Sequence, residues 1–149
     1  MSPSTRLGMI ALAVIIPAAG CGHPDKKPSV DLTFYQAPTV LPLTPLDGQA
    51  FTVSWRVFNA DYFENREALN VAWTISRDGV AGFASGVIPS LRSRTFVDLS
   101  FIDTQTAGPH SYAFSIDQAD ATREANEANN TTGITVVVVP SPPPPSTTG

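Results

Sequence analysis

Apolar and polar residues alternate with a period of two along much of the chain. Residues 50–59 carry apolar side chains at Phe51, Val53, Trp55 and Val57, with polar residues between them. Such alternation buries one face of a strand and leaves the other in water, which is typical of an antiparallel sheet. The same pattern, or a run of β-branched residues, predicts further strands over 30–36, 69–76, 80–88, 94–102, 111–117 and 134–139.

Turn-forming residues separate these runs at intervals of roughly ten residues. Gly82 and Gly86 interrupt the run 80–88, which predicts a bent strand at the edge of a sheet. Seven strands of this kind predict an all-β fold, a β-sandwich. Trp55 and Trp73 lie on the apolar phase of their strands, so we expect both to pack between the two sheets.

The first 20 residues have a different pattern. Arg6 precedes an apolar run from Leu7 to Ala19, and Gly20 then leads to Cys21, the single cysteine of the sequence. A charged segment, an apolar segment and small residues before a cleavage site are the parts of a secretory signal peptide. The apolar run is shorter than the roughly 20 residues that a membrane-spanning helix needs.

The segment Ala18-Ala19-Gly20-Cys21 resembles the lipobox of bacterial lipoproteins, with Ala18 where leucine is usual. The resemblance implies a signal peptide over 1–20, a lipid on the Cys21 thiol, acylation of its new amino group by a fatty acid such as palmitate, and attachment to a membrane in the cell envelope. Gly22, in place of aspartate, favours the outer membrane if the cell has two. Two other interpretations stay open: an ordinary secretory signal with an incidental cysteine, and a membrane anchor.

Composition divides the rest of the chain into three parts. Residues 21–29 form a polar spacer with two prolines, and residues 140–149 form a proline-rich tail that favours an extended conformation. Between them, residues 30–139 make up about 110 residues, the size of one domain. One cysteine cannot close an internal disulfide bond. The net charge of -4 and the scattered arginines argue against nucleic-acid binding.

Polar residues are densest between the last two predicted strands. Asn and Asp side chains bond to nearby backbone and tolerate left-handed conformations, so we expect a structural loop motif that pins this crossing. Carboxylates are also the ligands that calcium prefers, although the spacing differs from that of a twelve-residue calcium loop. The structural motif comprises Asp117, Glu124, Asn126, Glu127, Asn129 and Asn130. The weaker calcium alternative uses Asp117, Asp120, Glu124 and Glu127.

This loop also resembles a known family. Asp117 followed by Glu124-Ala-Asn126-Glu127-Ala-Asn129-Asn130 and a valine-rich strand is similar to the ending of the CARDB domain, a cell-adhesion-related domain found in bacteria. Weaker similarities occur in order at 30–32, 53–59 and 108–112. The resemblance implies a seven-stranded immunoglobulin- or fibronectin-III-like sandwich over 30–139, with an adhesion role and no catalytic residues. Asp61 and the segment 92–94 depart from it, because the family usually has glycine there.

No catalytic motif is evident in the sequence. His23 and His110 make no convincing zinc set, and no phosphate-binding glycine loop is present. Tyr62 and Phe63 would form a small contact patch if exposed, or cap the sandwich if turned inward. We therefore expect a noncatalytic, lipid-anchored envelope protein without a cofactor that presents one module to a protein or glycan. The alternative is a calcium-dependent or small-ligand binding protein that uses the acidic loop 117–130.

Overall fold

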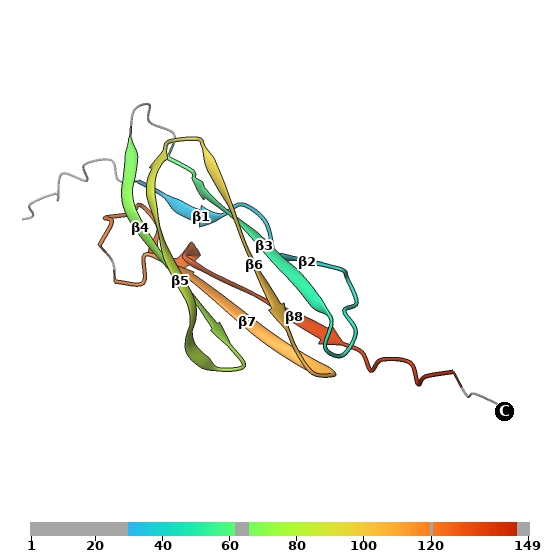
Figure 1. Ribbon diagram of the computed structural model, residues 1–149. Coiled ribbons are helices and arrows are strands. Elements are labelled where there is room, and N and C mark those ends of the chain that lie inside the picture. The colour runs from blue at the N-terminus through green and yellow to red at the C-terminus, as the bar shows by residue number, and fades with distance from the viewer. Residues whose placement is uncertain (1–29, 62–65, 120, 146–149) are drawn as a thin grey trace, which may run out of the picture.

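The computed structural model describes residues 30–61, 66–119 and 121–145. Two four-stranded antiparallel sheets form a β-sandwich (Figure 1), which confirms the predicted fold class. The elements in chain order are β1 (Leu32–Phe34), β2 (Thr39–Leu41), β3 (Ala50–Asn59), β4 (Glu67–Arg77), β5 (Val80–Arg92), β6 (Phe96–Thr104), β7 (Gly108–Ile116), the 3-10 turn η1 (Glu127–Asn129) and β8 (Thr131–Val138).

The first sheet is centred on β3. β6 pairs along one side of β3, while β1 and β2 pair with opposite ends of its other side. The predicted count of seven strands is therefore wrong by one, because the first edge is divided into β1 and β2. Pro38 lies in this break, where its missing N–H cannot contribute to a ladder.

The second sheet has the order β5-β4-β7-β8. β5 lies at its edge, as the two glycines of that run predicted, and Gly82 adopts a left-handed φ of 76°. The described part of the chain contains no helix that is both long enough and apolar enough to cross a membrane.

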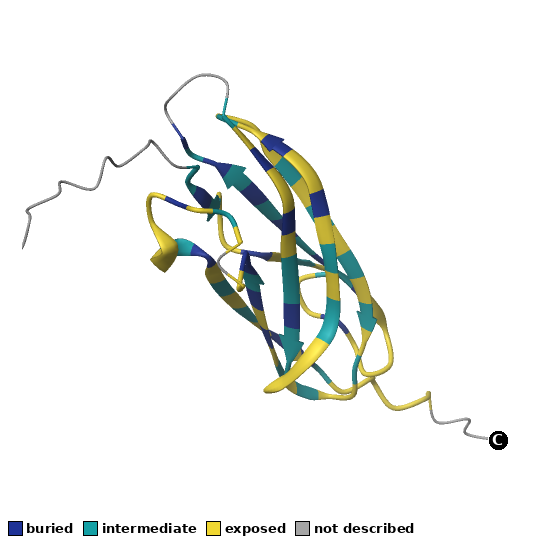
Figure 2. Cartoon of the chain, turned by 90° about the vertical axis from the view of Figure 1, so that its left-hand side faces the viewer, coloured by how far each residue is buried: buried dark blue, intermediate teal, exposed yellow. Residues whose placement is uncertain are grey.

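The core lies between the inward faces of the two sheets. Along the strands, the buried residues that face the core alternate with more exposed residues that face outward (Figure 2). Trp55 is buried at its centre, with its ring 5.4 Å from Trp73 and 5.1 Å from Phe114. Trp73 is half-buried and packs over Gly86, where an added Cβ would come within 2.4 Å of the indole. Both tryptophans therefore serve the core, as their positions in the pattern predicted.

The alternation over 69–76 predicts that Leu69 faces inward with Val71, Trp73 and Ile75, and for Leu69 this prediction is wrong. Leu69 is exposed, and Ala68 is buried in its place. The reason is Asn70, whose left-handed φ of 54° changes the phase of β4 between Ala68 and Val71. An asparagine tolerates this conformation better than most residues do.

The two ends of the described chain lie at opposite ends of the sandwich (Figure 1). β1 begins beside the end of β3, whereas β8 ends beside residues 45–47. There the Val139 N–H donates to the Pro45 carbonyl at 2.9 Å, and the Asp47 N–H donates to the Val139 carbonyl at 2.8 Å. The proline-rich tail therefore leaves from the end opposite to residue 30, where the described chain begins.

Candidate functional site

The densest polar site is the crossing loop, residues 117–130, which joins β7 to β8. It begins at Asp117, whose left-handed φ of 47° ends β7. The Asp117 carboxylate accepts hydrogen bonds from the backbone N–H groups of Ala121 at 3.1 Å and Thr122 at 2.6 Å. Its own N–H donates to the Ala72 carbonyl at 2.8 Å. Asp117 thus shapes the backbone of the loop that follows it.

Glu124 ties the crossing loop to the first sheet. One of its oxygens accepts the backbone N–H of Leu32 at 2.8 Å, and the other accepts the Asn130 amide at 2.9 Å. Beside this contact, the Ala125 N–H donates to the Val30 carbonyl at 2.8 Å. The loop and β1 are therefore joined by one backbone hydrogen bond and by a buried carboxylate that accepts the N–H of Leu32.

The remaining motif residues complete the same network. The Asn126 side chain caps η1 by accepting the Ala128 N–H, and Glu127 accepts the Glu124 N–H at 3.0 Å. Asn129 donates across to Asp31 at 3.0 Å. The structure thus brings all six residues of the predicted loop motif together, with their side chains bonded to the protein itself.

Glu124 has an unusually high pKa for a carboxylate. Burial raises the pKa of Glu124 to about 7, and the nearby carboxylates of Glu127 and Asp117 add to that rise. The hydrogen bonds from Leu32 and Asn130 favour the charged form and oppose the shift. Because all its donors are neutral, the charged form of Glu124 lacks a compensating cation.

The calcium ligands of the alternative interpretation are not arranged as a cluster in the described residues. Asp117, Glu124 and Glu127 each accept hydrogen bonds from the protein, and Asp120 lies outside the described residues. Among the residues that the structure describes, no group of three or more His, Cys, Asp or Glu side chains could hold a metal ion.

A second polar cluster lies at the other end of the sandwich. Asp103 of β6 accepts both hydrogen bonds of Arg77 Nη1, the shorter at 2.9 Å, and the Tyr112 hydroxyl at 2.6 Å. Burial raises the pKa of Asp103, but the bonds from Tyr112, Arg77, Thr104 and Gln105 lower it below its ordinary value. Tyr112 thus bonds a side chain of the opposite sheet and joins the two sheets at this end.

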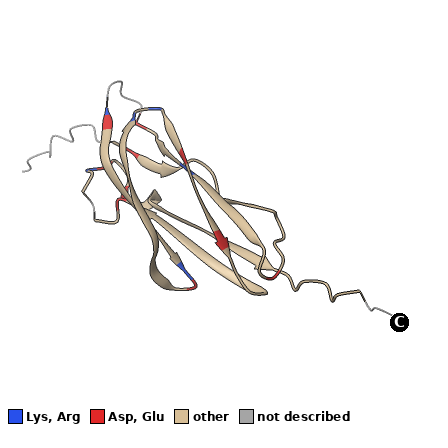
Figure 3. Cartoon of the chain, viewed as in Figure 1, with Lys and Arg blue, Asp and Glu red and all other residues tan. Residues whose placement is uncertain are grey.

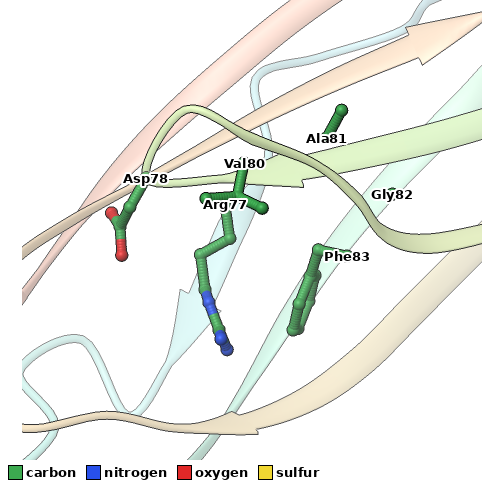
Figure 4. Close-up of a pocket in the computed structure, with 6 residues that line it drawn as sticks. All are labelled: Arg77, Asp78, Val80, Ala81, Gly82 and Phe83. Atoms are coloured by element: carbon green, nitrogen blue, oxygen red, sulfur yellow. The ribbon is translucent and has the colours of Figure 1, made fainter.

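A shallow hollow of about 280 Å³ opens beside this cluster at the turn between β4 and β5. Figure 4 shows Arg77 and Phe83 side by side in it, with the guanidinium carbon 4.4 Å from the ring centroid. The charged groups of its wall are already bound, since Arg77 bonds Asp103 and Asp78 bonds His110. This hollow therefore offers no activated acid, base or nucleophile.

His110 donates or accepts at both ring nitrogens. Nδ1 lies 2.9 Å from the Asp78 carboxylate and Nε2 lies 2.9 Å from the Thr106 carbonyl. Two acceptors favour the doubly protonated ring, so the pKa of His110 is raised, chiefly by Asp78, and that of Asp78 is lowered. Ser111 meets Asp78 through its backbone N–H, not its hydroxyl. These residues close a turn and do not form a catalytic triad.

Solved structures of other proteins share this fold. The CARDB domain of the PF1109 protein from Pyrococcus furiosus, crystallised in complex with di-metal ions, superposes with a TM-score of 0.65 at 20% identity, covering 76% of this chain and 97% of that one. Its solution structure gives a TM-score of 0.59 at 17% identity, covering 74% and 94%. A protein domain from Methanosarcina acetivorans gives a TM-score of 0.55 at 21% identity, covering 74% and 93%.

The chain has a CARDB fold. No family model matches the chain, and no curated protein matches it in sequence. The resemblance drawn from the loop motif is therefore confirmed at the level of fold, by three-dimensional similarity.

Asn59, the last residue of β3, belongs to the segment 53–59 that also resembles the CARDB domain. Asn59 is completely buried; its amide donates to the Leu91 carbonyl at 3.1 Å and its oxygen accepts the Asp61 N–H at 3.2 Å. Its carbonyl accepts the N–H of Arg94, which adopts a left-handed φ of 59°. Arg94 lies in the segment where CARDB domains usually have glycine. The left-handed conformation costs arginine about 1 kcal/mol more than it would cost glycine.

Several predicted site residues lie outside the described residues. They are the lipid attachment residue Cys21, the aromatic pair Tyr62 and Phe63, and Asp120.

Sequence reasoning missed one group of side chains altogether. Tyr35, Phe58 and Phe96 meet on the outer face of the first sheet, next to an ion pair between Arg56 and Asp98. A signal was present, because Phe58 occupies the polar phase of β3, where an aromatic ring must face outward. The pairing of Phe58 with Phe96 required the register of the sheet.

Proposed function

We propose that the chain is a noncatalytic lipoprotein of the cell envelope that presents one CARDB-like module to a protein or glycan partner. The observation that carries this proposal is the lipobox-like segment that ends at Cys21. It is followed by a short polar spacer and then by the β-sandwich. The name of the Methanosarcina acetivorans neighbour assigns that protein to the cell surface, which supports the same location for this one.

The geometry of the sandwich gives this proposal an orientation. A lipid at Cys21 and the spacer 21–29 hold the end that contains β1 and the crossing loop towards the membrane. The opposite end, with the Asp103 cluster and the proline-rich tail, then points away from it (Figure 1). Two or more acyl chains anchor far more stably than one. Gly22 after the cysteine supports the outer membrane as the destination in a cell with two membranes.

The absence of catalysis in this proposal rests on how the polar groups are used. The carboxylates of Asp103, Asp117 and Glu124, and the imidazole of His110, all hold strands or turns together. Figure 3 shows that charged residues are sparse on the strands and lie mainly near their ends. A noncatalytic module that binds through its surface is consistent with that distribution.

The anchor is tested by replacing the thiol in the full-length protein. Cys21→Ser should retain the signal peptide, take up no fatty-acid label and leave the detergent phase in a phase-partition assay. Ala18→Leu is the matched control, because it restores the residue usual in lipoboxes and should be processed at least as well. A Cys21→Ser protein that is cleaved normally and still partitions with detergent would overturn the lipoprotein proposal.

The partner is tested by capture from an envelope extract, with the full-length protein and a version lacking residues 140–149 in parallel. Capture of the same material by both assigns binding to the module. Capture by the full-length protein alone assigns it to the tail and contradicts the proposed role of the sandwich.

A second candidate is calcium-dependent binding through the crossing loop. The side-chain oxygen of Asn130 is buried without a hydrogen-bond partner, while the nitrogen of the same amide donates to Glu124 and Glu127. The PF1109 domain was crystallised in complex with di-metal ions. This function predicts a rise in melting temperature with calcium that Glu124→Ala and Asp120→Ala abolish. An unchanged melting temperature with calcium and with chelator would rule it out.

A further inference from the structure

The outer face of the β1-β3-β6 sheet carries a compact group of large side chains. The register between β3 and β6 places these side chains in two neighbouring cross-strand pairs, Arg56 with Asp98 and Phe58 with Phe96. The Tyr35 N–H donates to the Arg56 carbonyl at 3.0 Å, which brings Tyr35 to the same level. We call these five residues (Tyr35, Arg56, Phe58, Phe96 and Asp98) the aromatic platform.

Two of the three rings of the platform are open to solvent, and the third, Phe58, is half-buried. Tyr35 is 57% exposed and Phe96 is 51% exposed. Their centroids are 6.4 Å apart and their planes differ by only 30°, while Phe58 lies edge-on to Tyr35 at 5.5 Å. A contiguous exposed apolar patch rimmed by polar residues is typical of an interaction site, whereas singly scattered apolar residues are not.

A polar pair is built into the platform. Arg56 Nε and Nη2 donate to the two carboxylate oxygens of Asp98 at 2.6 and 2.9 Å. The same guanidinium lies 3.8 Å from the centroid of Phe96. Arg56 is thereby held on two sides, and the pair presents hydrogen-bond donors and acceptors in a preset plane with no net charge.

This chemistry discriminates between classes of ligand. A cationic ligand would compete with Arg56 for the face of Phe96. An anionic ligand would meet a guanidinium already neutralised by Asp98. A purely apolar ligand would remove water from the Arg56–Asp98 pair and give it no new hydrogen bonds, which is costly.

A sugar ring meets each requirement of the platform. Its C–H groups can rest on the exposed ring of Tyr35 and on the part of the Phe96 ring that Arg56 leaves exposed. Its hydroxyl groups can donate to Asp98 and accept from the N–H groups of Arg56 that Asp98 leaves free, because a guanidinium has five donors. Flat apolar area beside a few preset polar groups is the usual composition of a specific small-molecule site.

The opposite outer face of the sandwich provides an internal contrast. β4, β5, β7 and β8 have no Asp, Glu, Lys or Arg between their ends. That face presents Ala, Ser and Thr side chains beside the exposed aliphatic residues Leu69, Val87 and Val137. Its register joins Thr74 to Ser115 and Ser115 to Thr131. No comparable group of rings with a polar pair lies on that face in the described residues.

We propose that the aromatic platform is a binding site for a neutral glycan chain, with Tyr35 and Phe96 as stacking residues and Arg56 and Asp98 as hydroxyl-binding residues. This proposal rests on one part of the proposed function, that the module binds a partner. It goes further by naming a glycan, and not a protein, as that partner.

The test measures binding of the full-length lipid-anchored protein, in detergent micelles, to cellohexaose, chitohexaose and mannohexaose by isothermal titration calorimetry. Binding to at least one of the three is expected. Phe96→Ala and Tyr35→Ala should each weaken it at least tenfold, and Asp98→Asn should weaken it as well. Tyr35→Phe, which keeps the ring, should bind nearly as the wild type does.

Ile102→Ala is the matched control. Ile102 is 72% exposed on the same strand and the same outer face, at the other end from Phe96. Its substitution should leave affinity unchanged, and equal melting temperatures for all variants exclude a folding defect. The proposal is overturned if none of the three oligosaccharides binds, if Phe96→Ala binds as the wild type does, or if Ile102→Ala weakens binding as much.

The outcomes separate this proposal from the lipoprotein proposal. Phe96→Ala should partition with detergent as the wild type does, because the anchor lies at Cys21. If Cys21→Ser loses the membrane but keeps oligosaccharide binding, both proposals are supported. If material captured from an envelope extract is protein alone and is still lost with Phe96→Ala, the platform binds protein and the glycan proposal fails.

Discussion

Two buried carboxylates join the same two sheets at opposite ends of the sandwich, and they do so in different ways. Asp103 pairs with Phe51 at the start of β3, and receives a guanidinium and a hydroxyl from the other sheet. Glu124 binds Leu32, which pairs with Asn59 at the end of β3, and receives only neutral N–H donors.

The difference shows that the partner, rather than burial itself, decides the charge of a buried carboxylate. Burial raises the pKa of both groups. At Asp103 the bonds from Tyr112 and Arg77 outweigh burial, so the pKa falls below its ordinary value. At Glu124 neutral donors do not outweigh it, and the pKa rises to about 7. The two ends should therefore weaken at opposite extremes of pH.

The largest effect is expected from removing the carboxylate that has a cationic partner. Asp103→Ala leaves the half-buried guanidinium of Arg77 and the Tyr112 hydroxyl without their acceptor, which should lower the free energy of unfolding by about 3 kcal/mol. Urea unfolding followed by tryptophan fluorescence measures it. Asp98→Ala, on the same strand but in an exposed ion pair, is the control and should change much less. Equal losses in the two variants would contradict the role of Asp103.

The second prediction concerns the pH dependence of the Glu124 end. The ordinary pKa of Glu124 is 4.5 and its folded value is about 7, so the folded state binds more protons than the unfolded state between these values. Stability from this group is complete below pH 4.5 and is lost as the pH rises through 7. Over that window we expect a loss of roughly 1–2 kcal/mol, discounted for partial solvent screening.

Comparison with Glu124→Gln measures this term, because glutamine does not titrate. Both proteins should carry His110→Gln, since His110 titrates in a neighbouring range. Urea unfolding at pH 4.5, 6, 7 and 8 should give a flatter curve for Glu124→Gln. Parallel curves for the two proteins would show that Glu124 is not protonated preferentially in the folded state.

The third prediction isolates the hydroxyl that joins the sheets at the Asp103 end. Tyr112→Phe keeps the buried ring and removes one hydrogen bond, which should cost about 1 kcal/mol. In the Asp103→Ala background the Tyr112 hydroxyl has already lost its acceptor, so adding Tyr112→Phe should cost less there than in the wild type. A double-mutant cycle should therefore show coupling between the two positions. Strictly additive losses would mean that the Tyr112–Asp103 bond does not stabilise the fold.

The smallest effect is expected at the turn held by His110. Its pKa is raised above 6.5 by Asp78 and the Thr106 carbonyl, so its contribution is complete below pH 6.5 and is lost as the pH rises through the folded value. His110→Gln should cost about 0.5 kcal/mol at pH 6 and nothing measurable at pH 9. A constant difference across this range would exclude titration of His110 as its cause.

Much of the fold could be predicted from local pattern. The alternation of residues 51–57 predicts the buried face of β3, and the crossing-loop motif predicts its own structural use. Local pattern was less successful where one residue changes the backbone, as at Asn70, or where a proline divides an edge, as at Pro38. Each changes which way the following side chains face, and apolar content does not reveal that.

The sites depended on register. Phe58 is recognisable in the sequence as an aromatic ring on a polar phase, but its neighbour Phe96 lies on another strand. Arg56 and Asp98 are 42 positions apart, and nothing in their local sequences pairs them. Their contact follows from the alignment of β3 with β6, which depends on how all the inward residues pack.

The sequence alone determined most strand phases, the tryptophan core, the disulfide-free character of the domain and the spacing of the loop motif. These are local or compositional properties, and hydrophobic burial acts on them residue by residue. Only the tertiary structure decided that Glu124 would meet Leu32 across 92 positions, that Asp103 would receive Arg77, and that five side chains would form a platform. Such contacts depend on the pairing of distant strands, whose register is set by the packing of the whole sandwich.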